Sequence, residues 1–171
     1  MRDHAAHVFD LDGVVRDFAP GDPSAAIEAA LSLPSGHVAA TAFDADLLLP
    51  TITGRQTFED WYSAICAALE DATAEPGRVR HHMEAWRANR GTAIDETVER
   101  LEALRSAGHR TYVFTNGTDN VPAELELLGL GRLFDGLLNT ADFGVAKPDP
   151  LAYAAAHRAI EGDLGRELAR S

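Results

Sequence analysis

Two aspartates follow an apolar run near the start of the chain, separated by a single residue. Asp10 and Asp12 stand in the stretch HVFDLDGVVRD, with Gly13 directly after them. Unpaired carboxylates beside a buried strand cost free energy, so this pair indicates a chemical function. Two more polar groups follow later apolar runs, namely Thr115-Asn116-Gly117 and the lysine of the string KPDP, Lys147.

Together these groups offer what phosphoryl transfer needs. One carboxylate can act as a nucleophile and another as an acid or base. A hydroxyl beside backbone amides and a lysine can bind the phosphoryl oxygens. The carboxylate pair also needs a cation, and hard oxygen ligands favour Mg²⁺. We therefore expect Asp10 and Asp12 to hold Mg²⁺ and the substrate to be a small phosphorylated metabolite.

The elements that must position these groups form an alternation of strands and helices. Apolar runs predict strands over residues 5–11, 110–115 and 136–141, and the first of them reads as buried on both faces of a parallel sheet. Ligands bind such sheets at the carboxyl ends of the strands, so all three polar groups could face one crevice. The expected fold class is α/β, with a Rossmann-like parallel sheet core.

One long helical stretch interrupts this alternation. Asp22 and Pro23 are predicted to begin a first helix, and Thr57, with Asp60 three residues later, to cap another. A further amphipathic helix is expected within residues 77–90. We therefore expect residues 1–17 and 91–171 to form the Rossmann-like core, and residues 18–90 to form an inserted α-helical cap.

Composition limits the class of protein. The 171 residues suit one compact domain, and 46% hydrophobic with 25% charged residues is typical of a globular protein. The net charge of −12 argues against broad contact with nucleic acid or with an anionic membrane surface. Cys66 is the only cysteine, and neither a signal peptide nor an apolar run of membrane-spanning length is visible. A cytoplasmic monomer or homodimer is expected.

The strings DLDG, TNG and KPDP, each after a predicted strand and in this order, resemble the motifs of the haloacid dehalogenase superfamily. One such string alone would be weak evidence, but three in order are specific. The resemblance covers roughly the whole chain and is strongest over residues 101–156. There the stretch LGLGRLFDGLLNTADFGVAKPDPLAY is similar to the phosphatase-like branch.

The resemblance implies a role for each motif residue. Asp10 would attack phosphorus and form an aspartyl-phosphate, while Asp12 would protonate the leaving oxygen and later deprotonate water. Asp10 would give Mg²⁺ a side-chain oxygen and Asp12 its backbone carbonyl. Thr115 would bind the phosphoryl group through its hydroxyl, helped by the backbone amide of Asn116, and Lys147 would offset negative charge.

Further residues are candidates for contact with the substrate. Gly13 would permit the tight turn after the nucleophile, and Gly117 stands beside Asn116 in the second motif. Arg55, just before a helix of the cap, could reach an anionic substrate, although solvated loop arginines are commoner. Asp17 suits a loop or helix cap as well as a contact in the site.

The chain departs from the family pattern because members carry a fourth, acidic motif after another strand. Gly162-Asp163 resembles that motif superficially, but we expect a helix end and a loop there, and an exposed edge on the first strand that could pair with another chain.

The expected activity is Mg²⁺-dependent hydrolysis of small phosphomonoesters. The open alternatives are a phosphomutase, a 2-haloacid dehalogenase-type hydrolase, and a truncated or degenerate member that binds a phosphorylated ligand without turnover. Asp12 favours the phosphatase, because the dehalogenase branch characteristically lacks this second aspartate.

Overall fold

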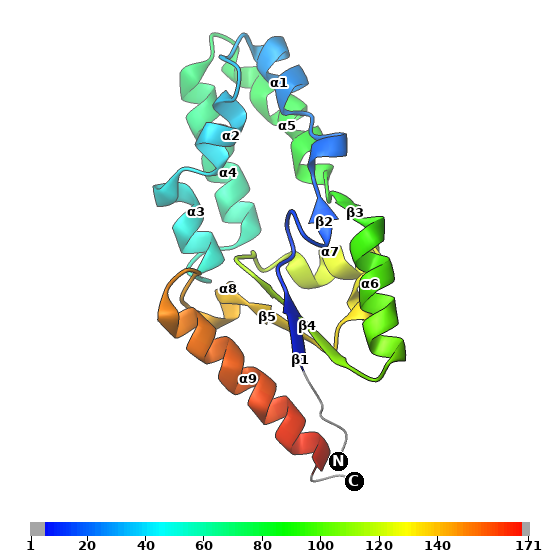
Figure 1. The fold of residues 1–171 in the computed structure, drawn as a ribbon. Coiled ribbons are helices and arrows are strands. Elements are labelled where there is room, and N and C mark those ends of the chain that lie inside the picture. The colour runs from blue at the N-terminus through cyan, green and yellow to red at the C-terminus, as the bar shows by residue number, and fades with distance from the viewer. Residues whose placement is uncertain (1–5, 169–171) are drawn as a thin grey trace.

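A three-stranded parallel sheet lies at the centre of the molecule, which is seen in a computed structural model that describes residues 6–168. Its strands are β1 (Ala6–Phe9), β4 (Arg110–Thr115) and β5 (Gly136–Asn139), in the order β1-β4-β5. Because all three run in the same direction, their carboxyl ends meet at one edge of the sheet (Figure 1). The α/β fold class predicted from the sequence is confirmed.

Helices cover both faces of this sheet. The helices α6 (Asp95–Ser106) and α7 (Val121–Leu127) pack on one face, and α9 (Pro150–Leu168) packs on the other (Figure 1). Successive residues of β4 point to opposite faces, so Val113 enters the layer under α6 and α7, while Tyr112 and Phe114 enter the layer under α9. The central strand is therefore buried on both sides, as its continuous apolar sequence predicts.

The strand β1 differs from its prediction. It is an edge strand in the described part of the chain, where it pairs with β4 and with no other strand. Val8 is 47% exposed, so the prediction of a strand buried on both faces is wrong. An apolar run reports hydrophobicity but not the number of neighbouring strands. The exposed edge on the first strand is confirmed.

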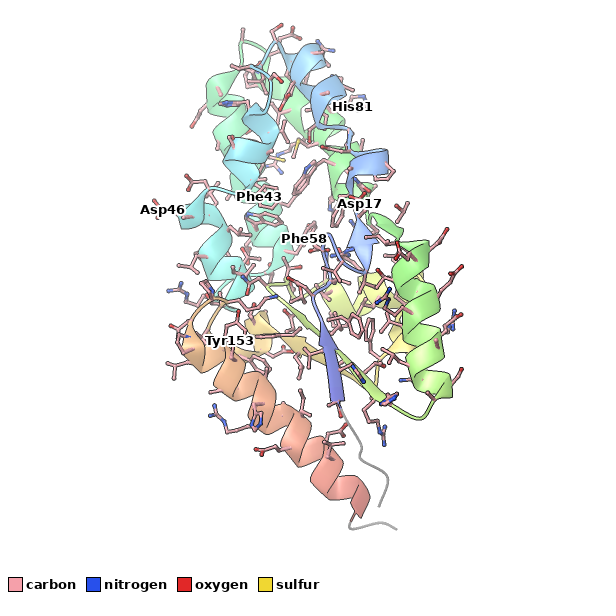
Figure 2. The ribbon with its side chains drawn as sticks, in the orientation of Figure 1. Asp17, Phe43, Asp46, Phe58, His81 and Tyr153 are labelled. Carbon is pink, nitrogen blue, oxygen red and sulfur yellow. The ribbon has the colours of Figure 1, made fainter. Side chains whose placement is uncertain are left out.

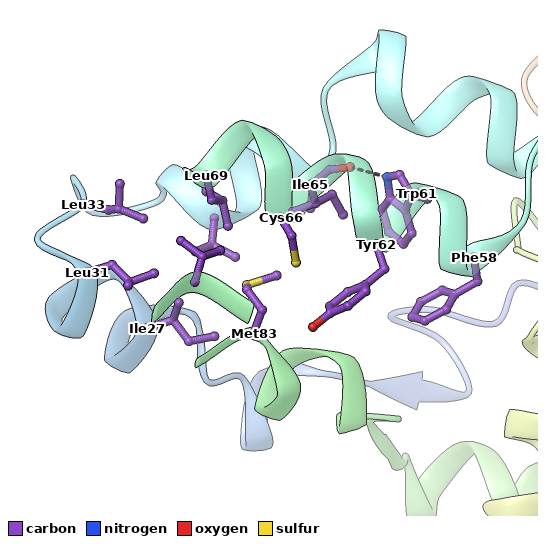
Figure 3. Close-up of a cluster of buried hydrophobic side chains, with 13 residues drawn as sticks. Ile27, Leu31, Leu33, Phe58, Trp61, Tyr62, Ile65, Cys66, Leu69 and Met83 are labelled. Carbon is purple, nitrogen blue, oxygen red and sulfur yellow. Dashed lines mark hydrogen bonds between the residues drawn. The ribbon is translucent and has the colours of Figure 1, made fainter. Parts of the chain in front are cut away.

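The helical insertion, residues 19–88, forms a second layer above the carboxyl edge of the sheet (Figure 1). Its main helices are α1 (Ser24–Leu31), α2 (His37–Ala42), α3 (Ala45–Ile52), α4 (Phe58–Ala72) and α5 (Val79–Ala88). They enclose a hydrophobic cluster of their own, and α4 contributes Phe58, Trp61, Tyr62, Ile65, Cys66 and Leu69 to it (Figure 3). The insertion therefore has a core separate from those of the sheet.

Local sequence signals set the starts of two of these helices. The side chain of Thr57 accepts a hydrogen bond from the Asp60 backbone amide, and the Asp60 carboxylate accepts one from the Thr57 amide. This capping box confirms the predicted start of α4 and lowers the pKa of Asp60. Asp22 accepts a bond from the Ser24 amide at 2.9 Å, but Pro23 is the N-cap residue and α1 begins at Ser24, one position later than predicted.

The chain enters and leaves the helical insertion through two short strands that the sequence did not predict. These strands, β2 (Arg16–Asp17) and β3 (Thr92–Ala93), pair in an antiparallel manner. Two-residue strands carry no readable periodicity, because their pairing depends on segments more than seventy residues apart. The pair ties the two ends of the insertion together beside the first polar motif.

The last helix continues through the segment where a helix end was predicted. The helix α9 runs unbroken past Gly162 to Leu168, so the predicted loop at Gly162-Asp163 is wrong. Asp163 accepts a hydrogen bond of 2.8 Å from the hydroxyl of Tyr112, and burial with this bond raises the pKa of Tyr112 to about 12. Among the helices that the structure describes, none has the length and apolar character needed to cross a bilayer.

Candidate active site

Asp10 follows β1 directly and faces a lysine that approaches from the third motif. Its Oδ1 accepts a hydrogen bond from the Leu11 amide at 2.8 Å and lies 3.0 Å from Lys147 Nζ. Lys147 Nζ also donates to the backbone oxygen of Phe114 at 2.9 Å, so the end of β4 holds the ammonium group in place. Asp10 remains 49% exposed. The first and third motifs therefore meet at the carboxyl edge of the sheet.

The second motif holds the third one in position. Asn116 Nδ2 donates to the Lys147 backbone oxygen at 3.0 Å, and the Lys147 amide donates to Asn116 Oδ1 at 2.8 Å. The Asn116 side chain thus pairs with the backbone of Lys147 as a neighbouring strand would. The sequence predicts a role for the backbone amide of Asn116 but not this side-chain contact, because the partners are 31 positions apart.

Packing at the end of β4 explains two other motif residues. Thr115 is buried as the last residue of the strand. A Cβ atom on Gly117 would lie 2.5 Å from Val121 Cγ2 and 2.9 Å from Asn139 Oδ1, so a larger residue would displace the loop. Gly13 has φ +79°, as the predicted tight turn after the first motif requires.

Asp12 belongs to a charge network, centred on the buried Arg16, that the sequence did not predict. Its Oδ1 accepts a 2.7 Å hydrogen bond from Arg16 Nε, and Arg16 also donates to Glu124 at 2.6 Å. Glu124 lies 3.7 Å from Arg90 as well, so it joins two arginines. Burial alone would lower the pKa of Arg16, but Asp12 and Glu124 outweigh it and raise that pKa. The cationic Arg16 therefore orients the Asp12 carboxylate.

The only feature of the sequence that could have indicated this network is the four-residue spacing of Asp12 and Arg16. The Glu124 partner lies 108 positions from Arg16 and could be found only from the fold. Asp12 itself is 48% exposed, so the network holds one of its oxygens without burying the carboxylate.

A cavity of about 290 Å³ lies between the helical insertion and the polar loops. Asp12, Asn116 and Gly117 of the predicted site line it, together with aromatic residues of the insertion. In Figure 2, Phe58 lies where the insertion meets the core, and Phe43 lies further into the insertion. The cavity therefore joins the polar loops to an aromatic wall.

Two hydrogen bonds hold this wall against the core. The carboxylate of Asp119, in the loop after β4, accepts a 2.7 Å bond from the Phe58 amide at the start of α4. The hydroxyl of Thr140, after β5, donates to the backbone oxygen of Ile52 at 2.7 Å. Both core residues follow strands at the carboxyl edge, so the loops that shape the site also fix the insertion above it.

Two predicted candidates lie elsewhere. Arg55 is exposed in the loop before α4, donates from Nε to Thr53 Oγ1 at 3.1 Å, and is not among the residues that line the cavity. Asp17 accepts a 2.9 Å bond from the Ala19 amide, which is the loop-capping role that the sequence left open. Neither contact points to a substrate.

The donor set fits Mg²⁺ in its chemistry. Among the described residues no three His, Cys, Asp or Glu side chains gather as a metal cluster. Mg²⁺ in proteins, however, commonly keeps several waters and takes one or two carboxylates together with substrate phosphate oxygens. The half-exposed Asp10 carboxylate and the backbone oxygen of Asp12 are hard oxygen donors of this kind.

Comparison with known proteins gives matches over nearly the whole chain. A family model described as a haloacid dehalogenase-like hydrolase matches residues 5–168. A phosphoglycolate phosphatase of Caulobacter vibrioides is 31% identical over 168 residues, which cover 96% of this chain and 69% of that protein. An (S)-2-haloacid dehalogenase 4A of Burkholderia cepacia is 36% identical over 63 residues, 36% of this chain and 27% of that protein.

Solved structures share the fold. An enzyme of the same family from Bacteroides thetaiotaomicron, in complex with magnesium and inorganic phosphate, matches with a TM-score of 0.67 at 16% identity, over 91% of this chain and 78% of that one. The L-2-haloacid dehalogenase of Xanthobacter autotrophicus with chloropropionic acid covalently bound matches with a TM-score of 0.61 at 20% identity. That match covers 91% of this chain and 64% of the dehalogenase, less than two thirds of its length.

Proposed function

The chain belongs to the haloacid dehalogenase-like hydrolases, and from this membership we propose that it hydrolyses small phosphomonoesters with Mg²⁺. The observation that carries the proposal is the contact of Asp10 with Lys147 at 3.0 Å, beside a second carboxylate that Arg16 orients. The 31% identity to a phosphoglycolate phosphatase supports a phosphate ester as the substrate. The presence of Asp12 supports the same choice.

Asp10 is the nucleophile in this proposal. Its hydrogen bond from the Leu11 amide and its ion pair with Lys147 both fall on Oδ1, so Oδ2 attacks phosphorus. The attack forms an aspartyl-phosphate and breaks the bond between phosphorus and the ester oxygen. Lys147 and the hydroxyl of Thr115 stabilise the negative charge on the phosphoryl oxygens, and Asn116 keeps Lys147 in reach through its contacts with the lysine backbone.

Asp12 transfers the protons. Arg16 holds its Oδ1, so Oδ2 gives a proton to the departing ester oxygen. The same oxygen then takes a proton from the water that attacks the aspartyl-phosphate. Cleavage of the bond between phosphorus and Asp10 releases inorganic phosphate and restores both carboxyl groups to their starting states.

The Asp10 carboxylate and the Asp12 backbone oxygen would hold Mg²⁺. When bound, the ion would supply positive charge beside the phosphoryl oxygens and reduce the repulsion between phosphate and Asp10. The helical insertion acts as a cap in this proposal, because its aromatic side chains cover the polar loops and exclude water during transfer.

A 2-haloacid dehalogenase activity is the second candidate, favoured by the local 36% identity to the Burkholderia enzyme. In that reaction Asp10 would displace halide from carbon, and the acid role of Asp12 would have no use. Release of chloride from 2-chloropropionate, measured beside release of phosphate from phosphate esters, distinguishes the two. Transfer of the phosphoryl group to another hydroxyl of the substrate, in place of release of inorganic phosphate, would indicate a phosphomutase.

The proposal is tested with p-nitrophenyl phosphate, with Mg²⁺ and after treatment with a chelator. We expect the chelator to abolish turnover and Mg²⁺ to restore it, because the phosphate and Asp10 repel one another without a cation. Asp10→Asn should reduce turnover to background even with Mg²⁺, since an amide oxygen is a poor nucleophile. Turnover that survives either change would contradict the proposal, and binding without turnover in the wild type would favour the non-catalytic alternative.

A further inference from the structure

We propose that the cavity under the helical insertion selects phosphomonoesters whose organic part is an uncharged aromatic group. The proposal rests on the phosphatase function above and names its class of substrate. Three observations support it: the aromatic composition of the cavity wall, the existing bonds of the arginines that line the cavity, and the volume of the cavity.

One wall of the cavity is rich in aromatic side chains. It is built by Phe18, Phe43, Phe58, Trp61 and Trp86. Trp61 makes edge contacts with Phe58 at 5.9 Å and with Trp86 at 5.6 Å between ring centroids. These three rings form a continuous set in which a further ring can take an offset or edge-to-face position.

The indole nitrogen of Trp61 is already engaged. Trp61 Nε1 donates to the backbone oxygen of Ala42 at 3.1 Å, so Trp61 presents apolar surface to the cavity (Figure 3). Phe43 is 65% exposed although it is a large apolar side chain, and it lines the same cavity. Exposure of such a residue costs free energy that an apolar ligand would recover.

The cations of the cavity are also engaged. Arg16 is bound by Asp12 and Glu124, and Arg90 lies 3.7 Å from Glu124 and donates to the backbone oxygens of Arg87 and Asn89. Among the described residues that line the cavity, these are the two with a permanent positive charge. A carboxylate on the organic part of a substrate would therefore compete with Glu124 for these arginines, and it would also meet the negative charges of Glu124 and Asp22.

The volume suits a ring-bearing group. A buried cavity of about 150 Å³ is known to be large enough for benzene in another protein. The cavity here, about 290 Å³, exceeds that and stays near the lower end of the range for small-molecule sites. It is larger than a two-carbon acid such as the glycolate part of phosphoglycolate would fill. Volume and charge therefore both favour an aromatic group over a short anionic one.

The chain offers a direct optical test of this proposal. Its two tryptophans, Trp61 and Trp86, both line the cavity, so intrinsic fluorescence reports on cavity occupancy. We would titrate the full chain with Mg²⁺ and benzylphosphonate, and separately with phosphonoacetate. These probes share a methylene phosphonate and differ in carrying a phenyl ring or a carboxylate, and neither is hydrolysed. Inorganic phosphate gives the baseline.

We expect benzylphosphonate to change the fluorescence and to bind about 10-fold more tightly than phosphonoacetate. Phe43→Ala removes a ring from the wall without opening a buried core, because this side chain is exposed. The substitution should weaken the binding of benzylphosphonate about 3- to 10-fold and change the affinity for phosphonoacetate by less than about 2-fold. Leu127→Ala, at an exposed position on α7 outside the cavity lining, is the matched control and should change neither affinity.

Equal or tighter binding of phosphonoacetate would overturn the proposal, as would equal losses for both probes in Phe43→Ala. The kinetic counterpart compares benzyl phosphate with phosphoglycolate. If both esters are hydrolysed with Asp10 required but phosphoglycolate has the higher kcat/KM, the aromatic preference fails while the phosphatase function stands. If neither ester is hydrolysed, the phosphatase function fails, and the fluorescence titration still decides what the cavity binds.

Discussion

Two clusters of aspartate and arginine lie at opposite edges of the same sheet, and they differ in how completely the aspartate is bonded. At the carboxyl edge, Asp12 accepts one bond from Arg16 and stays 48% exposed. Near the amino end of β4, Asp135 accepts bonds from Arg105 at 2.9 Å and from Arg110 at 2.8 Å. It also accepts one from the Thr111 amide, and only 12% of its side chain is exposed.

The difference separates a half-exposed carboxylate that lines the cavity from a largely buried one that stabilises the fold. Burial alone would raise the pKa of Asp135, but the Thr111 amide and the two arginines outweigh burial and lower it. All its bonds favour the charged form, and both oxygens are occupied. Asp12 lines the cavity and accepts its hydrogen bond from Arg16 on one oxygen only, so it gains less from the fold than Asp135 does.

The largest effect that tests this comparison is expected from Asp12→Asn. The variant keeps the Asp10 nucleophile but lacks the acid and base, so turnover of an alkyl phosphate should fall by roughly 10² to 10⁴. An aryl phosphate, whose leaving group needs no proton, should lose less in the first step. Rapid quench with ³²P-labelled substrate should trap aspartyl-phosphate, since its hydrolysis needs the missing base.

The free energy of unfolding of Asp12→Asn should fall by no more than about 1 kcal/mol, because the carboxylate is half exposed. Asp10→Asn provides the control for the trapping experiment, and no label should appear on it. Equal losses for alkyl and aryl esters, with no labelled intermediate, would show that Asp12 does not act as the acid and base.

Asp135→Ala should give the opposite pattern. It removes the carboxylate to which Arg105, Arg110 and the Thr111 amide all donate. We expect the free energy of unfolding, measured with urea, to fall by about 3 kcal/mol, while kcat of the folded fraction is unchanged. Asp71→Ala, at an exposed position, should change stability by less than about 0.5 kcal/mol. A loss of kcat without a loss of stability would reverse the roles of the two clusters.

Those parts of the fold that depend on neighbouring residues could be predicted from the sequence. The strand over residues 110–115 was predicted with its observed bounds, because it is a continuous apolar run that ends at polar residues. The start of α4 followed from Thr57 and Asp60, whose reciprocal bonds are local. The motif order also placed Asp10 and Lys147 at one edge, since parallel strands bring their carboxyl ends together.

The parts that depend on distant partners could not be predicted. The apolar run before Asp10 is the same whether one or two strands flank it, so the exposure of Val8 was missed. Gly162 weakens a helix locally, but α9 continues through it while packing on the sheet through Ala152 and Ala156. The bond between Arg16 and Glu124 joins residues that only the fold brings together.

The smallest expected effect is a contribution of Asp135 to the pH dependence of the free energy of unfolding. Its pKa in the folded protein lies below that of an unfolded aspartate, which is about 3.9. Its contribution to the free energy of unfolding is therefore fully present above the unfolded pKa and is lost as the pH falls through the folded pKa.

We would measure urea unfolding of the wild type and of Asp135→Asn, a variant of nearly equal size, at several pH values from 7 to 3. The wild type should be the more stable of the two at pH 5 to 7, and the gap should narrow as the pH falls below about 4, because protonation of Asp135 then weakens its bonds to Arg105 and Arg110. Leu127→Ala carries no titratable change and should differ from the wild type by the same amount at every pH. The difference in free energy of unfolding between the wild type and Asp135→Asn could instead stay constant or widen down to pH 3. The charge of Asp135 would then contribute nothing to stability, and Asp135 would differ from Asp12 only in its burial.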